Sequence, residues 1–155
     1  MRFELDKIFK KIHHDIDKTG WHVLSVASDH PSDHYCYTIG LYKSFSMPEI
    51  VMKGLPIETM HMLVNDVVKS KPDFSNIDEK YVLVQGLLRN SFDLCLQKLD
   101  YDQIKEHIFY CSKVNSPNIF SVCQLYWPDT KNNLPISNQC DFKVQQAQNW
   151  KFNDN

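Results

Sequence analysis

The sequence has almost no arginine and no strong excess of charge of either sign. Its 155 residues include 17 lysines and arginines and 19 aspartates and glutamates, which gives a formal net charge of −2. The only arginines are Arg2 and Arg89. Arginine is the preferred side chain for phosphate groups, and proteins that bind nucleic acids normally carry a basic face. We therefore expect no nucleic acid among the partners of this protein.

Long hydrophobic runs and paired cysteines are also missing. No apolar run approaches the length that crosses a membrane, and the charged N-terminal stretch has no apolar segment typical of a signal peptide. The five cysteines are odd in number and form no CxxC pair, which indicates reduced thiols. We expect a cytoplasmic protein with no membrane partner.

Common catalytic and nucleotide-binding motifs are absent as well. The sequence contains no GxSxG, no Walker loop, no GxGxxG and no cysteine in a nucleophile motif. These absences remove nucleotide-driven chemistry and the usual hydrolase designs from the leading functions, and we expect no cofactor. An enzyme of another design is still compatible with the sequence.

Histidines are present in fair number but not in a metal-binding pattern. Three of them, His22, His30 and His34, lie near one predicted turn, and Pro31 separates the last two. A zinc site needs three or four converging ligands, and a loop does not provide the helical spacing of an HExxH motif. We predict a polar loop and no metal, although the sequence alone leaves metal binding by these three histidines open.

The composition is that of an ordinary globular domain, with 43% hydrophobic and 23% charged residues. We expect one domain over residues 1–155, in which residues 137–155 form a poorly patterned tail. Helical spacing of apolar residues predicts helices, and short β-branched or aromatic runs predict strands. The helices are expected at 3–18, 57–68 and 100–114, and the strands at 21–28, 35–42, 49–54, 81–88, 91–99 and 118–129.

The order of these elements predicts the fold class. Short turns between consecutive strands favour antiparallel pairing, and the helices must cover an apolar face of the sheet. The sequence therefore predicts an α+β protein with two layers, in which about three helices cover a mostly antiparallel sheet of about six strands.

A series of short motifs runs through the chain. It comprises Gly20-Trp21, Tyr37-Thr38-Ile39-Gly40-Leu41, Pro48-Glu49, Gly54-Leu55-Pro56, Gln124-Leu125 and Trp127-Pro128-Asp129 followed by Pro135. This series resembles the bacterial family known as domain of unknown function 4262, from Gly20 to about Pro135. The resemblance implies a compact bacterial domain of the cytosol and no established reaction.

The chain departs from the family's pattern at two places. Met47 stands where a histidine often precedes the Pro-Glu pair, and Thr130 stands where a glycine usually follows the Trp-Pro-Asp turn. Both places lie beside candidate polar chemistry. The departures therefore count against any family activity that depends on that histidine.

Glu49 is the most informative single residue because its carboxylate precedes the apolar run Ile50-Val51-Met52. A buried carboxylate without partners is costly, so it must be paired or hydrogen-bonded. One interpretation is structural, with Arg89 or backbone N–H groups as partners. The other is functional, with Glu49 as a general acid/base or a ligand anchor.

A pocket between the 37–49 hairpin and the end of the last strand is the functional alternative. Apolar walls with a few polar groups are typical of a small-molecule site, and Trp21 is a further candidate wall. The candidate ligand-binding residues are Tyr37, Thr38, Glu49, Gln124, Trp127 and Asp129.

The leading functional hypothesis is a non-catalytic module that binds a small molecule or a protein. A more specific form is an immunity-type protein that neutralises a toxin through an acidic patch of Asp29, Asp33, Asp73, Asp78 and Glu79. The alternative is a small hydrolase or transferase that uses Glu49 or Asp129 as acid/base. A purely structural or oligomer-forming protein is the third hypothesis, and the sequence leaves the oligomeric state open.

Overall fold

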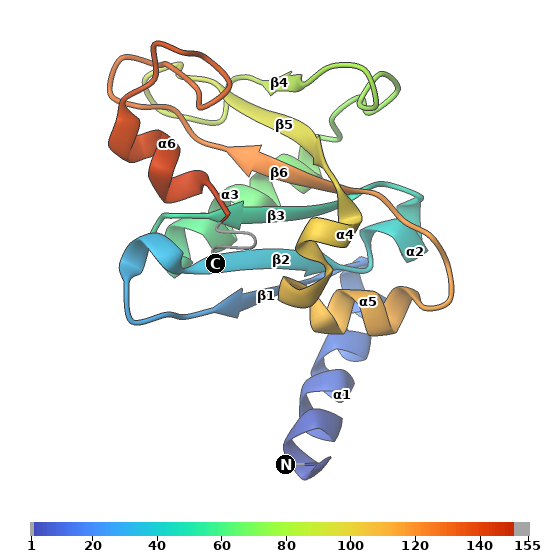
Figure 1. Ribbon diagram of the computed structural model, residues 1–155. Coiled ribbons are helices and arrows are strands. Elements are labelled where there is room, and N and C mark those ends of the chain that lie inside the picture. Colours follow the sequence, from blue (N-terminus) through green and yellow to red (C-terminus); the bar gives the residue numbers. More distant parts are fainter. Residues whose placement is uncertain (1, 151–155) are drawn as a thin grey trace.

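The computed structural model describes residues 2–150, which form one six-stranded mixed sheet with helices around it (Figure 1). The strands lie in the order β1-β2-β3-β6-β5-β4. They are β1 (His22–Val26), β2 (Tyr35–Ile39), β3 (Glu49–Lys53), β4 (Val82–Val84), β5 (Leu94–Leu99) and β6 (Val122–Tyr126). The β3–β6 pair is parallel and the other neighbouring pairs are antiparallel. The α+β class and the mostly antiparallel six-stranded sheet are thus confirmed.

Six α-helices lie within residues 2–150, so the expectation of about three is wrong. The long ones are α1 (Arg2–Thr19) and α3 (Ile57–Lys69), both near their predicted positions. The shorter ones are α2 (Leu41–Phe45), α4 (Tyr101–Ile104), α5 (Phe109–Asn115) and α6 (Phe142–Gln148), with 3-10 turns η1 (Pro31–Asp33) and η2 (Lys105–His107). No helix in this part of the chain is both long and apolar enough to span a bilayer.

The differences between the predicted and the observed helices have local physical causes. The predicted helix 100–114 is interrupted because the backbone at Ile108 leaves the helical region, with φ −125° and ψ 48°. The predicted strand 35–42 ends at Ile39 because Gly40 takes φ 115°, and α2 begins directly after it. Both α2 and α6 are too short to show a helical period in the sequence, and α6 lies in the tail that was expected to have little pattern.

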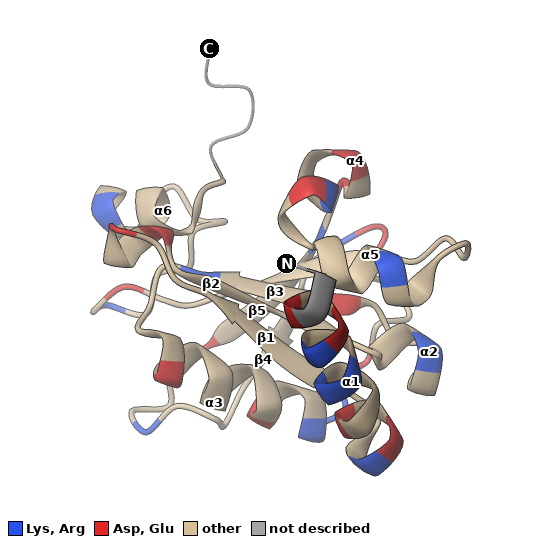
Figure 2. Cartoon of the chain, turned by 90° about the horizontal axis from the view of Figure 1, so that it is seen from below, with Lys and Arg blue, Asp and Glu red and all other residues tan. Residues whose placement is uncertain are grey.

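The sheet carries packed helices on both faces, so the expectation of two layers is not confirmed (Figure 2). Along β3, Ile50 and Met52 belong to one core cluster and Val51 to the other, as the alternation of a strand requires. The first cluster joins the sheet to α3, and the second joins it to α1 and α5. All five residues of β3 are buried, because this central strand is covered from both sides.

The backbone at Gly54, directly after β3, passes very close to α6. Gly54 has φ +101°, and a Cβ atom on it would lie 2.7 Å from the backbone oxygen of Ala147. Gly86 also has a positive φ, of +87°, but nothing lies within 4 Å of its Cβ position. Both glycines therefore have a positive φ that disfavours other residues, but only Gly54 lies too close to a neighbouring backbone for a Cβ atom.

We predict that Gly54→Ala lowers the free energy of unfolding by about 2 to 4 kcal/mol, through left-handed strain plus the collision with α6. Gly86→Ala is the matched control and should cost only the strain, about 1 to 2 kcal/mol. Urea unfolding followed by circular dichroism measures both. Equal losses in the two variants would show that the contact between residues 54 and 147 is unimportant.

Candidate functional site

The Glu49 carboxylate lies inside the protein at the start of β3 and is 1% exposed. Oε1 accepts a hydrogen bond from the Leu41 N–H at 3.1 Å, and Oε2 accepts bonds from the N–H groups of Gly40 and Tyr42 at 3.1 and 3.3 Å. A helix leaves its first N–H groups without partners, and these donors lie at the start of α2. Glu49 therefore supplies the acceptors for this turn from the neighbouring strand.

Two side chains complete the surroundings of this carboxylate. Thr38 Oγ1 in β2 donates to Glu49 Oε1 at 2.8 Å and accepts the Ile50 N–H at 2.9 Å. Asn115 Nδ2, from α5, donates to Glu49 Oε2 at 2.9 Å. Among the side chains described, those of residues 4–150, the Asn115 Oδ1 atom is the one buried polar atom without a hydrogen-bond partner. The carboxylate thus connects β2, β3, α2 and α5.

The pKa of the Glu49 carboxyl reflects its burial and its hydrogen bonds. Burial raises the pKa of Glu49, while the hydrogen bonds from Asn115, Thr38 and the backbone act to lower it. Burial and the nearby Glu49 charge raise the pKa of the Cys111 thiol well above its usual range, so this cysteine is no nucleophile. Arg89 is exposed and is not a partner of Glu49. Of the structural interpretations, the one with backbone N–H groups is correct.

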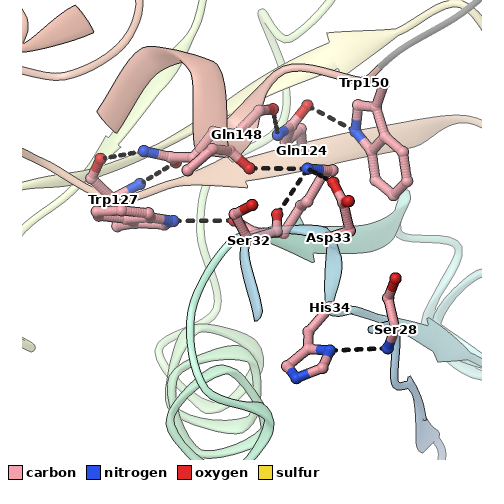
Figure 3. A network of polar contacts seen from close by, with 10 residues as sticks. Ser28, Ser32, Asp33, His34, Gln124, Trp127, Gln148 and Trp150 are labelled. Carbon is pink, nitrogen blue, oxygen red and sulfur yellow. Dashed lines mark hydrogen bonds and ion pairs between the residues drawn. The ribbon is translucent and has the colours of Figure 1, made fainter. Parts of the chain in front are cut away.

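Gln124 and Trp127 belong to a second polar network, formed with the C-terminal segment (Figure 3). The Gln124 amide donates to the Gln148 backbone oxygen at 2.7 Å and accepts from Trp150 Nε1 at 3.1 Å. The Gln148 amide accepts the Trp127 N–H and donates to the Trp127 oxygen, both at 2.8 Å. Gln148 thus pairs with the backbone of Trp127 as a neighbouring strand would.

Lys53 joins this network to the first hairpin. Its Nζ atom donates to the backbone oxygens of Ala147 and Ser32 at 2.9 and 2.7 Å and lies 3.3 Å from Asp33 Oδ1. The Lys53 backbone oxygen accepts Trp127 Nε1 at 2.9 Å. The amide of Gln124 and the backbone N–H of Trp127 are therefore already used to dock residues 148–150 on the sheet, and the indole N–H of Trp127 is used by the Lys53 backbone.

Asp129 organises the loop that follows β6. Its Oδ1 accepts the N–H groups of Lys131 and Asn133 at 2.9 and 2.8 Å, and its Oδ2 accepts the Asp141 N–H at 2.9 Å. These bonds lower the pKa of Asp129, the one from Asn133 most strongly, and partial burial acts in the opposite direction. The carboxylate closes a loop that begins and ends beside the start of α6.

The six predicted site residues therefore lie in separate networks. Thr38 and Glu49 are brought together, Gln124 and Trp127 are brought together, and Asp129 stands in its own loop. The Tyr37 hydroxyl lies in the second core cluster, where it accepts the Tyr110 N–H at 3.4 Å. In each case the polar group already has a partner within the protein. Ligand binding by these residues stays a prediction.

A different cluster of polar residues opens to the surface between α1, the start of β1 and α3. We call this place the α1–α3 hollow; its volume is about 470 Å³. Asp15 Oδ2 lies 2.6 Å from His22 Nδ1, and Trp21 Nε1 donates to Asn65 Oδ1 at 2.9 Å. These two pairs line the hollow together with His61.

The Asp15–His22 contact fixes the tautomer of the neutral histidine ring. An acceptor at Nδ1 places the proton of a neutral ring on that nitrogen, which leaves Nε2 with a lone pair. Nε2 has no partner within residues 2–150 and is not a buried unsatisfied atom, so it is open to solvent. Partial burial acts to raise the pKa of Asp15, but the hydrogen bonds and charges of His22 and Lys11 lower it overall.

Asn65 is oriented in the same way. Because its Oδ1 accepts from Trp21, its Nδ2 amide has two N–H groups that bind no described residue. The hollow thus presents an acceptor on His22 and donors on Asn65, both held by partners behind them. This is the usual construction of a binding or acid–base site.

No group of three or more histidine, cysteine or carboxylate side chains within residues 2–150 converges in a way that would hold a metal ion. His22 pairs with Asp15, whereas His34 Nδ1 accepts the Ser28 N–H at 2.9 Å in the first hairpin. Figure 3 shows this second contact. The two histidines thus serve different local contacts.

The structure is thus that of a small α+β protein in which the α1–α3 hollow is an organised polar opening at the surface. The chain matches the family described as "Domain of unknown function (DUF4262)" over residues 15–141, and it belongs to that family. No curated protein and no solved structure matches the chain.

Sequence reasoning missed Asp15 and Asn65 and gave His22 only a loop role. A signal was present, because Gly20 ends α1 and His22 begins β1, so the last turns of the helix must lie near the strand. Asn65 gave no such signal. It lies 44 positions from its partner Trp21, and only the packing of α3 on the sheet brings the two together.

We predict that Glu49→Gln lowers the free energy of unfolding by about 2 to 4 kcal/mol, because the new amide group places a donor against the donors that surround it. Glu79→Gln, at an exposed position, is the matched control and should stay within about 0.5 kcal/mol of the wild type. Chemical denaturation at neutral pH measures both variants. A stable, fully folded Glu49→Gln protein would contradict the capping role.

We also predict that Asp129 makes stability depend on acid pH. Because the pKa of Asp129 is lowered in the fold, its ionised form stabilises the protein above the unfolded-state pKa, about 3.9. That contribution is lost as pH falls through the folded-state pKa. The stability difference between the wild type and Asp129→Asn should therefore be largest near neutral pH and shrink below pH ~4, in urea unfolding at several pH values. Asp17→Asn, on the exposed side of α1, is the control; a difference that is independent of pH would contradict the assignment.

Proposed function

We propose that this protein is a small-molecule-binding module whose ligand occupies the α1–α3 hollow. One observation carries the proposal. His22 and Asn65 are each fixed by a hydrogen bond on one side and leave a polar atom open on the other. Protein groups held in this way bind a ligand without a large loss of side-chain entropy.

The surroundings of the residues first considered as catalysts favour binding over catalysis. Glu49 accepts five hydrogen bonds and is 1% exposed, so a substrate has no access to its carboxylate. Asp129 is occupied by three backbone N–H groups. A general acid or base must reach the proton that it transfers.

A small hydrolase or transferase is the second candidate, and the Asp15–His22 pair is the observation that favours it. A histidine whose Nδ1 is held by a carboxylate has its Nε2 prepared to accept a proton. In this alternative function, the general acid/base is His22 and not Glu49 or Asp129. The protein-binding and toxin-neutralising forms have no such structural support and stay predictions.

We propose the bacterial cytoplasm as the compartment. All five cysteines are buried and free, which fits a reducing environment. The family resemblance to bacterial proteins agrees with this proposal.

The binding proposal predicts that small molecules contact the hollow. In ¹⁵N NMR spectra, a fragment library should contain compounds that shift the Trp21 indole and Asn65 side-chain signals. His61→Trp places a large ring at the hollow and should weaken such compounds about tenfold. Met62→Trp, at the next exposed position of α3, should leave them unchanged. If no compound shifts these signals, the proposal fails.

A further inference from the structure

We infer that the α1–α3 hollow selects a small organic anion, a carboxylate or a phosphate ester, and that the bound anion draws a proton onto His22. The inference rests on the proposed binding function and names its ligand class. It is carried by the charges that line the hollow, by the ring orientation of His22 and by the indole of Trp21.

The charged groups of the hollow have a positive balance. Lys11, Lys18 and Lys69 line it, and Asp15 is its one lining carboxylate. Asp15 is already engaged by Lys11 at 3.1 Å as well as by His22 at 2.6 Å. The charges of Lys18 and Lys69 are therefore not neutralised by an ion pair within the described chain, and an anion is the ligand charge that they favour.

The concentration of lysines is local. Figure 2 shows basic and acidic residues mixed along α1, so the helix as a whole is not a positive surface. The hollow gathers lysines from two helices, Lys11 and Lys18 from α1 and Lys69 from the last turn of α3. A ligand between the helices lies near two lysines that form no ion pair in the described chain, Lys18 and Lys69, whereas basic and acidic residues are mixed along the rest of α1.

His22 completes the anion site once it carries a proton. The neutral ring presents a lone pair at Nε2, which repels an anionic oxygen, whereas the protonated ring donates a hydrogen bond from the same atom. Asp15 holds the ring through Nδ1, so Nε2 is the atom that takes up the proton. An anion beside Nε2 therefore binds the protonated ring more tightly, and protein and ligand take up a proton together.

The remaining wall of the hollow is Trp21, and its aromatic ring favours a ligand with an organic part. Trp21 is half-buried, its indole N–H is tied to Asn65, and its ring meets Phe45 edge to face with centroids 6.3 Å apart. A fixed aromatic surface binds the flat apolar part of a ligand. The free amide group of Asn65 is placed to donate to a ligand oxygen.

The first test compares charge at constant shape. Benzoate, phenyl phosphate, benzamide and benzylamine are titrated against the wild type and followed through the Trp21 indole signal. Benzoate or phenyl phosphate should bind about fivefold or more tightly than benzamide, and benzylamine most weakly. The stronger of the two anions identifies a carboxylate or a phosphate site. Equal or tighter binding of benzamide would overturn the inference and leave the binding function standing, whereas no binding by any compound in the library would remove both.

The second test isolates the lysines. Lys69→Glu should abolish the preference for benzoate over benzamide, because it replaces an attractive charge with a repulsive one. Lys80→Glu makes the same change at an exposed lysine outside the hollow and should keep the preference. Loss of preference in both variants would mean that net charge, and not the hollow, attracts the anion.

The third test measures the proton. Saturation with benzoate should move the pH midpoint of the His22 ring signals upward by about 0.5 to 1 pH unit. The midpoint of His30, an exposed histidine that does not line the hollow, should move less. By reciprocity, benzoate affinity should fall about three- to tenfold as pH rises through the histidine range, about 5 to 8, and His22→Gln should remove this dependence while His30→Gln, at an exposed position outside the hollow, keeps it. An unchanged His22 midpoint would overturn the coupling.

Discussion

The hydrogen bonding of the Glu49 carboxylate is the interaction on which the centre of this fold depends. Without it, the N–H groups at the start of α2 would be buried without acceptors, and Thr38 and Asn115 would lose their shared partner. A buried carboxylate without hydrogen-bond partners is costly in free energy. Each of the donors around Glu49 is therefore required as long as its charge is buried. A residue that looks catalytic in the sequence is thus a cap that joins two strands and two helices.

Buried polar groups with hydrogen-bond partners also hold the C-terminal segment on the sheet. The segment with α6 has few apolar residues, and it is held by the side-chain amides of Gln124 and Gln148 and by the ammonium group of Lys53. Polar groups buried under a polar segment are tolerated because each finds a partner. The chain therefore uses its buried polar residues to fix architecture, whereas the polar groups that line the α1–α3 hollow are partly exposed.

Much of the fold could be predicted, and the candidate site could not. The apolar spacing of α1 and α3 and the β-branched runs of the strands mark elements whose packing is set locally. The two predicted layers are not confirmed, and α2 and α6 were not predicted, because α2 depends on acceptors supplied from β3 and α6 depends on docking against β6. Glu49 was predicted to need partners, with Arg89 or backbone N–H groups as candidates, and the structure shows the backbone groups. Asp15 was not identified, since its role follows from the position of His22 and not from its own neighbours.

The sequence by itself determined the class of the protein, the number of strands, their mostly antiparallel arrangement and the family to which it belongs. These properties follow from local periodicity and short motifs, which a single chain displays without its neighbours in space. Only the tertiary structure decided which polar side chains are buried with partners inside the protein and which are exposed to solvent. That distinction depends on contacts between residues far apart in the chain, such as Trp21 with Asn65 and Glu49 with Asn115, and burial is a property of the packed whole.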